Sequence, residues 1–199
     1  MDVGVIGQAA GLFAVTNVDD IVILALFFAR SAGRRGAGLR ITAGQYLGFL
    51  AILAVAVPAA FGATLLPGSA IGYLGLLPLA LGLRAAWRTW RERDGDGEDD
   101  TPVARGGPGP LEVAAVTFAN GGDNIGVYVP VFATAGTDAM GVYAAVFLIL
   151  VAVWCAAGRF LATRPFVAGA LSRWGHIALP VVLIALGLVI LAEGGAFGL

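Results

Sequence analysis

Six long apolar stretches decide what this chain can fold into. Each is close to the roughly 20 residues that a helix needs to cross a bilayer, and they cover residues 4–29, 41–65, 70–88, 111–134, 139–160 and 176–195. Of the 199 residues, 59% are hydrophobic and only 13% are charged, against about 25% in an ordinary soluble domain. We therefore expect an all-α, polytopic membrane protein with six transmembrane helices.

The basic residues indicate how these helices are oriented. All 12 are Arg, and they fall in three groups of 4, 5 and 3, at residues 30–40, 84–105 and 159–173, which lie in or beside the first, third and fifth connections. Because Arg-rich connections stay on the cytoplasmic side, both termini of a six-helix chain are expected outside. The third connection, 91–110, is acidic and rich in Gly and Pro, as a solvated linker is. This cytoplasmic linker separates a three-helix unit, 1–90, from a second one, 111–199.

The two units carry related motifs. Thr16-Asn17-Val18-Asp19-Asp20-Ile21 in the first unit resembles Ala119-Asn120-Gly121-Gly122-Asp123-Asn124-Ile125 in the second. Because three is an odd number of helices, a duplicated unit must enter the membrane in the opposite sense. The sequence therefore predicts two inverted three-helix repeats within one membrane domain.

Three acidic residues, Asp19, Asp20 and Asp123, lie inside the apolar stretches. A carboxylate at the bilayer centre costs about 2.5–3.5 kcal/mol on insertion scales. The apolar residues of the first stretch only about balance that cost for its two acids. We expect the acids to face the bundle interior and to pair with a proton, a bound cation or an Arg from a connection.

Asn side chains flank these acids at helical spacing. Asn17 lies three residues before Asp20, and Asn120 lies three and four residues before Asp123 and Asn124, so each set shares a helix face. Carboxylate, amide and carbonyl oxygens form the shell that hard divalent cations prefer. We expect a metal site made of Asp19, Asp20, Asp123, Asn17, Asn120 and Asn124, in which the three Asp residues also carry protons.

A regular helix cannot aim Asp19 and Asp20 at one point, because consecutive residues differ by about 100°. Either one of them stands back from the ion or the helix unwinds. Gly121 and Gly122 favour unwinding in the second motif, which would free carbonyls as ligands, and Pro130 is a candidate kink. The alternatives are that both Gly residues only allow close helix packing, and that the Asn-Val-Asp-Asp run simply caps a helix.

The remaining polar residues of the apolar stretches are expected to serve packing or to lie at the membrane interface. They are Gln45, Cys155 and the Tyr residues at 46, 73, 128 and 143.

The two motifs resemble those of the cadmium-resistance transporter family, within the lysine-exporter superfamily. The resemblance rests on the segments 15–20 and 118–130 and extends over most of the chain in length, span number and motif spacing. It implies a protein that is not an enzyme, needs no resident cofactor, and exports divalent cations, cadmium above all, across a bacterial plasma membrane. Ligand hardness instead favours calcium- or manganese-like ions, so the metal stays open at this point.

Buried carboxylates can bind a proton and a cation in turn, so we expect a secondary exporter driven by proton exchange. The absence of Lys rules out a Walker A loop, and the net charge of −1 gives no basic surface for nucleic acid. An amino-acid exporter of the same superfamily is the alternative. An intramembrane aspartyl protease is a third hypothesis, although the Gly-x-Gly-Asp motif is absent. A homodimer is left open.

Overall fold

The computed structural model describes residues 3–66, 70, 73–91, 108–164 and 180–192. Within these ranges every regular element is a helix. The elements in chain order are α1 (Val3–Thr16), α2 (Val18–Arg30), α3 (Ala37–Ala63), the 3-10 turn η1 (Tyr73–Gly75), α5 (Leu76–Arg91), α6 (Pro110–Asn120), α7 (Gly122–Ala135), α8 (Thr137–Leu161) and a last helix, Pro180–Ala192.

Two of the described helices, α3 and α8, are by themselves long and apolar enough to cross a membrane, with 27 and 25 residues. The pair α1 and α2 qualifies as a third span when taken together, although it bends by 58° at the break. Tyr73–Arg84 and Pro180–Ala192 are shorter apolar helices. The all-helical prediction is therefore confirmed for the described residues, while two to three spans, not six, meet the length and hydropathy requirement.

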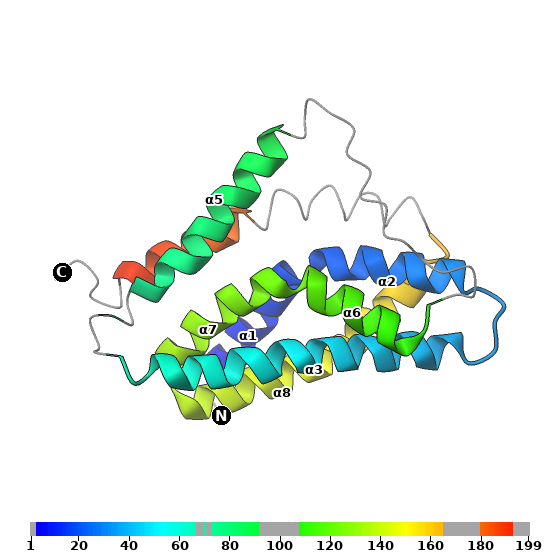
Figure 1. The fold of residues 1–199 in the computed structure, drawn as a ribbon, viewed down its shortest axis with the longest axis horizontal. Helices are drawn as coiled ribbons and strands as arrows, with labels where there is room; N and C mark the ends of the chain where they lie inside the picture. The colour runs from blue at the N-terminus through cyan, green and yellow to red at the C-terminus, as the bar shows by residue number, and fades with distance from the viewer. Residues whose placement is uncertain (1–2, 67–69, 71–72, 92–107, 165–179, 193–199) are drawn as a thin grey trace.

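The two long helices each support a pair of short helices that comes from the other part of the chain. Helix α3 packs chiefly against α6 and α7, whereas α8 packs chiefly against α2 and α1. Figure 1 shows the α1–α2 pair and the α6–α7 pair running in opposite directions, both on the same side of α3 and α8. The packing is thus reciprocal, and it brings together the two motifs identified in the sequence.

Glycines allow these helices to approach closely. A Cβ atom at Gly48 of α3 would lie 2.6 Å from Cβ of Thr117 in α6, and Gly44, one turn earlier, is equally close to α6. A Cβ at Gly158 of α8 would lie 2.6 Å from Cβ of Leu24 in α2. Small residues spaced four apart are a common device for bringing membrane helices into contact.

An aromatic cluster joins the four helices α1, α3, α7 and α8. Phe13 of α1 lies 5.4 Å from Phe49 of α3 and 5.5 Å from Phe147 of α8, measured between ring centroids. Tyr128 of α7 lies 4.8 Å from Phe147. All of these side chains are fully buried or nearly so. Large, stiff side chains of this kind fix the positions of the helices that carry them.

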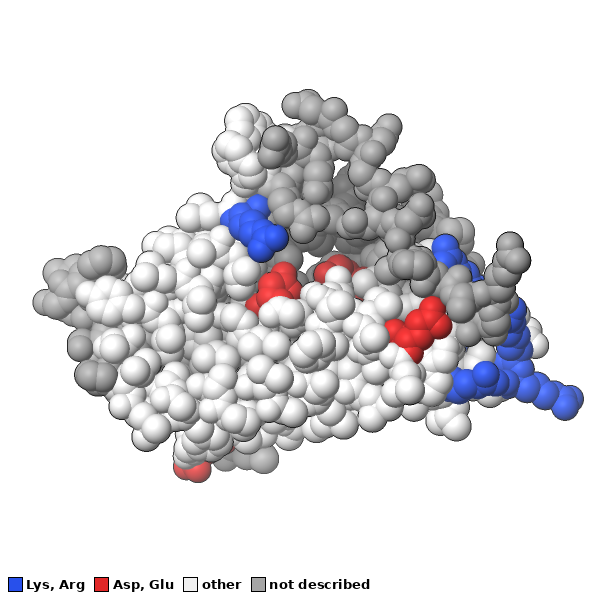
Figure 2. All heavy atoms as spheres, viewed as in Figure 1, with Lys and Arg blue, Asp and Glu red and all other residues white. Residues whose placement is uncertain are grey.

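Most of the Arg side chains visible in Figure 2 gather at one end of the bundle. They belong to the α2–α3 connection and to the end of α8, where Arg159 approaches Gly38. The first connection predicted from the sequence and the described beginning of the fifth therefore lie at the same end. The linker predicted at 91–110 lies largely outside the described residues.

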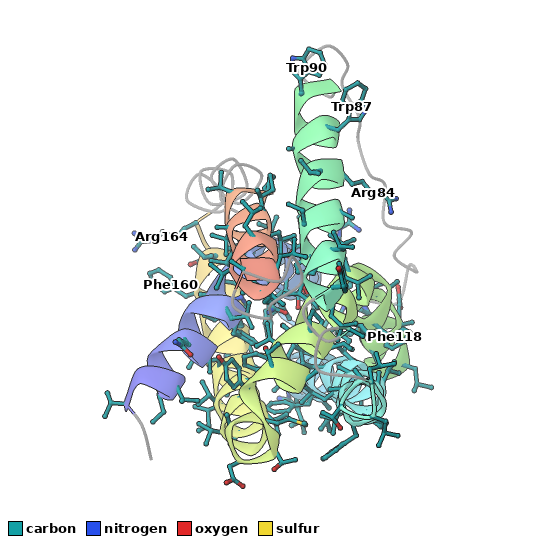
Figure 3. All side chains as sticks on the ribbon, turned by 90° about the vertical axis from the view of Figure 1, so that its left-hand side faces the viewer. Arg84, Trp87, Trp90, Phe118, Phe160 and Arg164 are labelled. Carbon is teal, nitrogen blue, oxygen red and sulfur yellow. The ribbon has the colours of Figure 1, made fainter. Side chains whose placement is uncertain are left out.

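Helix α5 leaves the bundle toward its carboxyl end. Figure 3 shows Trp90 and Trp87 toward its far end, with Arg84 on the same helix nearer the bundle. The two residues are 58% and 66% exposed, and their rings contact each other with centroids 5.4 Å apart. The same helix carries Arg84, and Trp together with Arg is typical of a membrane–water interface.

The close contact between α3 and α6 gives a stability prediction. Gly48→Val adds side-chain atoms where Ala114 and Thr117 already lie, so we expect the protein to lose about 1–3 kcal/mol of stability from overpacking. Gly62→Val, in the same helix, is the control, because nothing lies within 4 Å of its Cβ position. Thermal unfolding of both variants in detergent, followed by circular dichroism, checks the difference. Equal melting temperatures would show that the α3–α6 contact is not close.

Candidate functional site

Both sequence motifs lie at helix breaks of a single residue. Helix α1 ends at Thr16 and α2 begins at Val18, with Asn17 between them at φ −120° and ψ 23°. Helix α6 ends at Asn120, and α7 begins after Gly121, which has φ −86° and ψ 15°. The backbone departs from regular helix at the two places where the sequence carries its polar residues.

The first break is held from a neighbouring helix. The Asn17 backbone N–H still donates to Phe13 O at 3.0 Å, so the last turn of α1 closes normally. The carbonyl of Asn17 accepts a hydrogen bond of 2.6 Å from the Trp154 indole Nε1 of α8. A backbone carbonyl that loses its helical hydrogen bond within an apolar bundle needs such a partner, because unsatisfied backbone groups are costly there.

The acids occupy the first turns of the helices that follow the breaks. Asp19 and Asp20 lie in the first turn of α2, and Asp123 lies in the first turn of α7. Helix N-termini carry a partial positive charge that favours carboxylates. Asn17 occupies the N-cap position of α2 but makes no side-chain cap hydrogen bond, so the capping interpretation of the Asn-Val-Asp-Asp run holds for position alone. It does not shorten the span, because α1 precedes α2 directly.

The two motifs contact each other through their amide and carboxylate groups. Asn120 Nδ2 donates to Asp19 Oδ2 at 3.0 Å and to Asp20 Oδ1 at 2.9 Å. Asn124 Nδ2 donates to Asn17 Oδ1 at 3.2 Å. The earlier residue of one motif therefore meets the later residue of the other. This reversed order means that the broken helices cross in antiparallel directions.

The three carboxylates differ in their surroundings. Asp20 is buried, with 4% of its surface exposed, whereas Asp19 and Asp123 lie on the exposed side of the breaks. The charge of Asp123 is close enough to act on both other acids. Figure 2 shows acidic side chains near the middle of the molecule, while another lies beside the Arg-rich end.

Carboxylates alone do not form a metal centre here. Across the part of the chain that the structure describes, no three His, Cys, Asp or Glu side chains are grouped so that they could hold a metal ion. A cation bound at the breaks therefore needs amide, hydroxyl or backbone oxygens in addition to the acids.

Gln45 is a site residue that the sequence reasoning assigned to packing or to the interface. It lies in the first third of α3, is 3% exposed, and donates from Nε2 to Asp20 Oδ2 at 2.9 Å. Its Oε1 accepts a 2.6 Å hydrogen bond from Thr117 of α6. Its position within the apolar stretch 41–65 is the sequence feature that could have revealed this role, because a buried amide is costly there unless both of its ends are hydrogen-bonded.

Tyr128 packs in the core, in agreement with the expectation from the sequence, but it also contacts the site, which was not expected. Its hydroxyl lies 3.0 Å from Thr16 Oγ1 and accepts a hydrogen bond of 2.9 Å from Asn17 Nδ2. The side chain is fully buried and does not lie at an interface. Tyr128 follows Asn124 by four residues and so shares its helix face, which is the pattern that could have revealed it.

The second motif is interrupted at Gly121 and not at Pro130. Pro130 lies inside α7, which continues to Ala135. A Cβ at Gly121 would collide with Cδ1 of Ile52, whereas nothing lies near the corresponding position of Gly122. Gly121 therefore serves both as the break and as a close-packing residue, so the two interpretations of this glycine are compatible.

The comparison with known proteins agrees with the motifs. A family model described as cadmium resistance transporter matches residues 13–199, which include both helix breaks and nearly the whole chain. No curated protein and no solved structure gives a significant match. The family is one of transporters and not of enzymes. A match of this extent shows that the chain belongs to the cadmium resistance transporter family.

Proposed function

We propose that this protein exports divalent metal ions, cadmium above all, in exchange for protons, at a site between the two helix breaks. The observation that carries the proposal is the contact of Asn120 with both Asp19 and Asp20, which joins the two motifs at one point. The family membership supports cadmium as the substrate.

The proposed ligands form an oxygen-rich shell. Asp20 supplies the buried carboxylate, while Asp19 and Asp123 supply carboxylates on the exposed side, from which an ion would enter. The oxygens of Asn17, Asn120 and Asn124 complete the set. Oxygen ligands bind a soft ion such as cadmium less tightly than thiolates do, and an export site must release its ion. The single thiol, Cys155, is buried in the core and has no role in the proposal.

The helix ends contribute to the electrostatics of this site. The N-termini of α2 and α7 place partial positive charge beside the acids, and the C-termini of α1 and α6 add partial negative charge at the same breaks. Interrupted helices with this arrangement are typical of ion sites in secondary transporters. A proton and a metal ion can therefore alternate on the carboxylates without leaving a bare charge in the bundle.

The same proposal includes a six-span architecture of two inverted repeats in a bacterial plasma membrane, with both termini outside. Two observations support it. The contacts between the motifs run in reversed order, and each long helix packs on the broken helices of the other half.

Labelling of single cysteines tests the orientation. In a Cys155→Ala background the chain has no cysteine, so Arg35→Cys and Asp138→Cys can be examined one at a time; both positions are exposed. We expect a membrane-impermeant thiol reagent to label Asp138→Cys in intact spheroplasts and Arg35→Cys only after permeabilisation. Labelling of both from outside would contradict the orientation.

Export by substituted variants tests the site. We expect Asp20→Asn and Asp123→Asn to lose cadmium export while still reaching the membrane, because each removes a charge that binds metal and proton. Asp138→Asn and Cys155→Ala are the controls and should keep export. Efflux of radioactive cadmium from cells that lack their own exporters, with membrane levels determined by immunoblot, measures this. Normal efflux in Asp123→Asn would count against the site.

Proton exchange is tested in everted membrane vesicles that carry an acidic interior. We expect added cadmium to release protons from the lumen, recorded with a fluorescent pH indicator, and Asp20→Asn vesicles to give no response. Amino acids added in the same assay test the alternative substrate class of the superfamily. Proton release by amino acids, with none by cadmium, would replace the proposal by an amino-acid exporter.

A further inference from the structure

One nitrogen atom bridges the two acids of the first motif. Asn120 Nδ2, at the carboxyl end of α6, lies 3.0 Å from Asp19 Oδ2 and 2.9 Å from Asp20 Oδ1. Both of its N–H groups are therefore directed at carboxylates. An amide NH₂ group in this position stabilises the negative charge of both carboxylates through two charge-assisted hydrogen bonds.

A cation shared by Asp19 and Asp20 would have to lie where this nitrogen lies. Metal–oxygen distances for calcium-like ions are about 2.3–2.6 Å, so an ion that touches both carboxylates occupies the space between the same two oxygens. The Asn120 amino group and the ion exclude each other. Loading of the site thus requires Asn120 to move or to turn.

Asn120 is able to turn, whereas the other amide at Asp20 is not. Gln45 donates to Asp20 and accepts from Thr117, so both of its ends are held. Within the described residues, no hydrogen bond reaches Oδ1 of Asn120, and the side chain is only half-buried. Rotation of the amide by 180° replaces its donor by its acceptor, which is a ligand for a cation.

We propose that Asn120 is a built-in competitor of the transported ion. Its amino group holds Asp19 and Asp20 together in the empty carrier, and its oxygen joins the ion after the amide turns. This inference rests on the proposed function and adds that one side chain sets how weakly the ion is held. Weak binding favours release, and the empty carrier keeps its carboxylates paired.

Asn120→Asp tests the inference, because it removes the competing amino group and leaves an oxygen ligand. We expect the purified variant to bind cadmium about tenfold more tightly in calorimetry, with both KM and kcat of export falling because the ion is retained. A merely structural defect would lower kcat without lowering KM.

The matched control is Gln45→Glu, which adds the same charge to the other amide that contacts Asp20. It leaves Asn120 in place, removes a donor that fixes Asp20, and sets two like charges together in a buried position. We expect it to bind cadmium no more tightly than the unsubstituted protein. Equal tightening by both variants would show that added charge alone is responsible and would overturn the inference.

If Asn120→Asp is too unstable for calorimetry, its thermal unfolding in detergent, measured with and without cadmium, tests the same inference. We expect this variant to melt at a lower temperature without metal and to gain more from cadmium than the unsubstituted protein does. A smaller or equal gain would overturn the competitor role. The proposed function is judged separately, by Asp20-dependent cadmium export in the unsubstituted protein.

Discussion

The buried carboxylate of Asp20 is the constraint on which the rest of the structure depends. A charge inside an apolar bundle needs compensation, and here it comes from Gln45 of α3, Asn120 of α6 and the N-terminus of α2. Helices α3 and α6, which carry the two amides, pack closely through Gly44 and Gly48. A contact between backbones, made without any charged residue, thereby positions the amides around the acid.

The helices divide into two kinds with different physical tasks. Helices α3 and α8 are long and uninterrupted and supply packing surfaces, while α1–α2 and α6–α7 are interrupted and carry the acids. An interrupted backbone is tolerated in an apolar bundle only where its free groups find partners. The Trp154 indole at the Asn17 carbonyl is such a partner, so the scaffold helices also make the breaks sustainable.

Much of this site could be predicted from the sequence, because polar residues in apolar stretches stand out. Asn120 was identified in that way together with Asp19 and Asp20, and Asn124 together with Asn17, and the structure brings each set into contact across the two breaks. Gln45 was not expected at the site, because a single amide in an apolar stretch does not indicate which residue it will contact. That partner, Asp20, lies 25 residues away in sequence, and no periodicity connects the two.

The sequence by itself determined the helical membrane character, the two motifs and the family, because hydrophobicity and residue spacing are local properties. The tertiary structure alone decided that the breaks fall at Asn17 and Gly121, that α7 continues through Pro130, and that Asn120 bridges two acids. A local pattern can indicate that a carboxylate needs a partner. Which side chain becomes that partner depends on how distant helices pack, and this is a property of the folded chain alone.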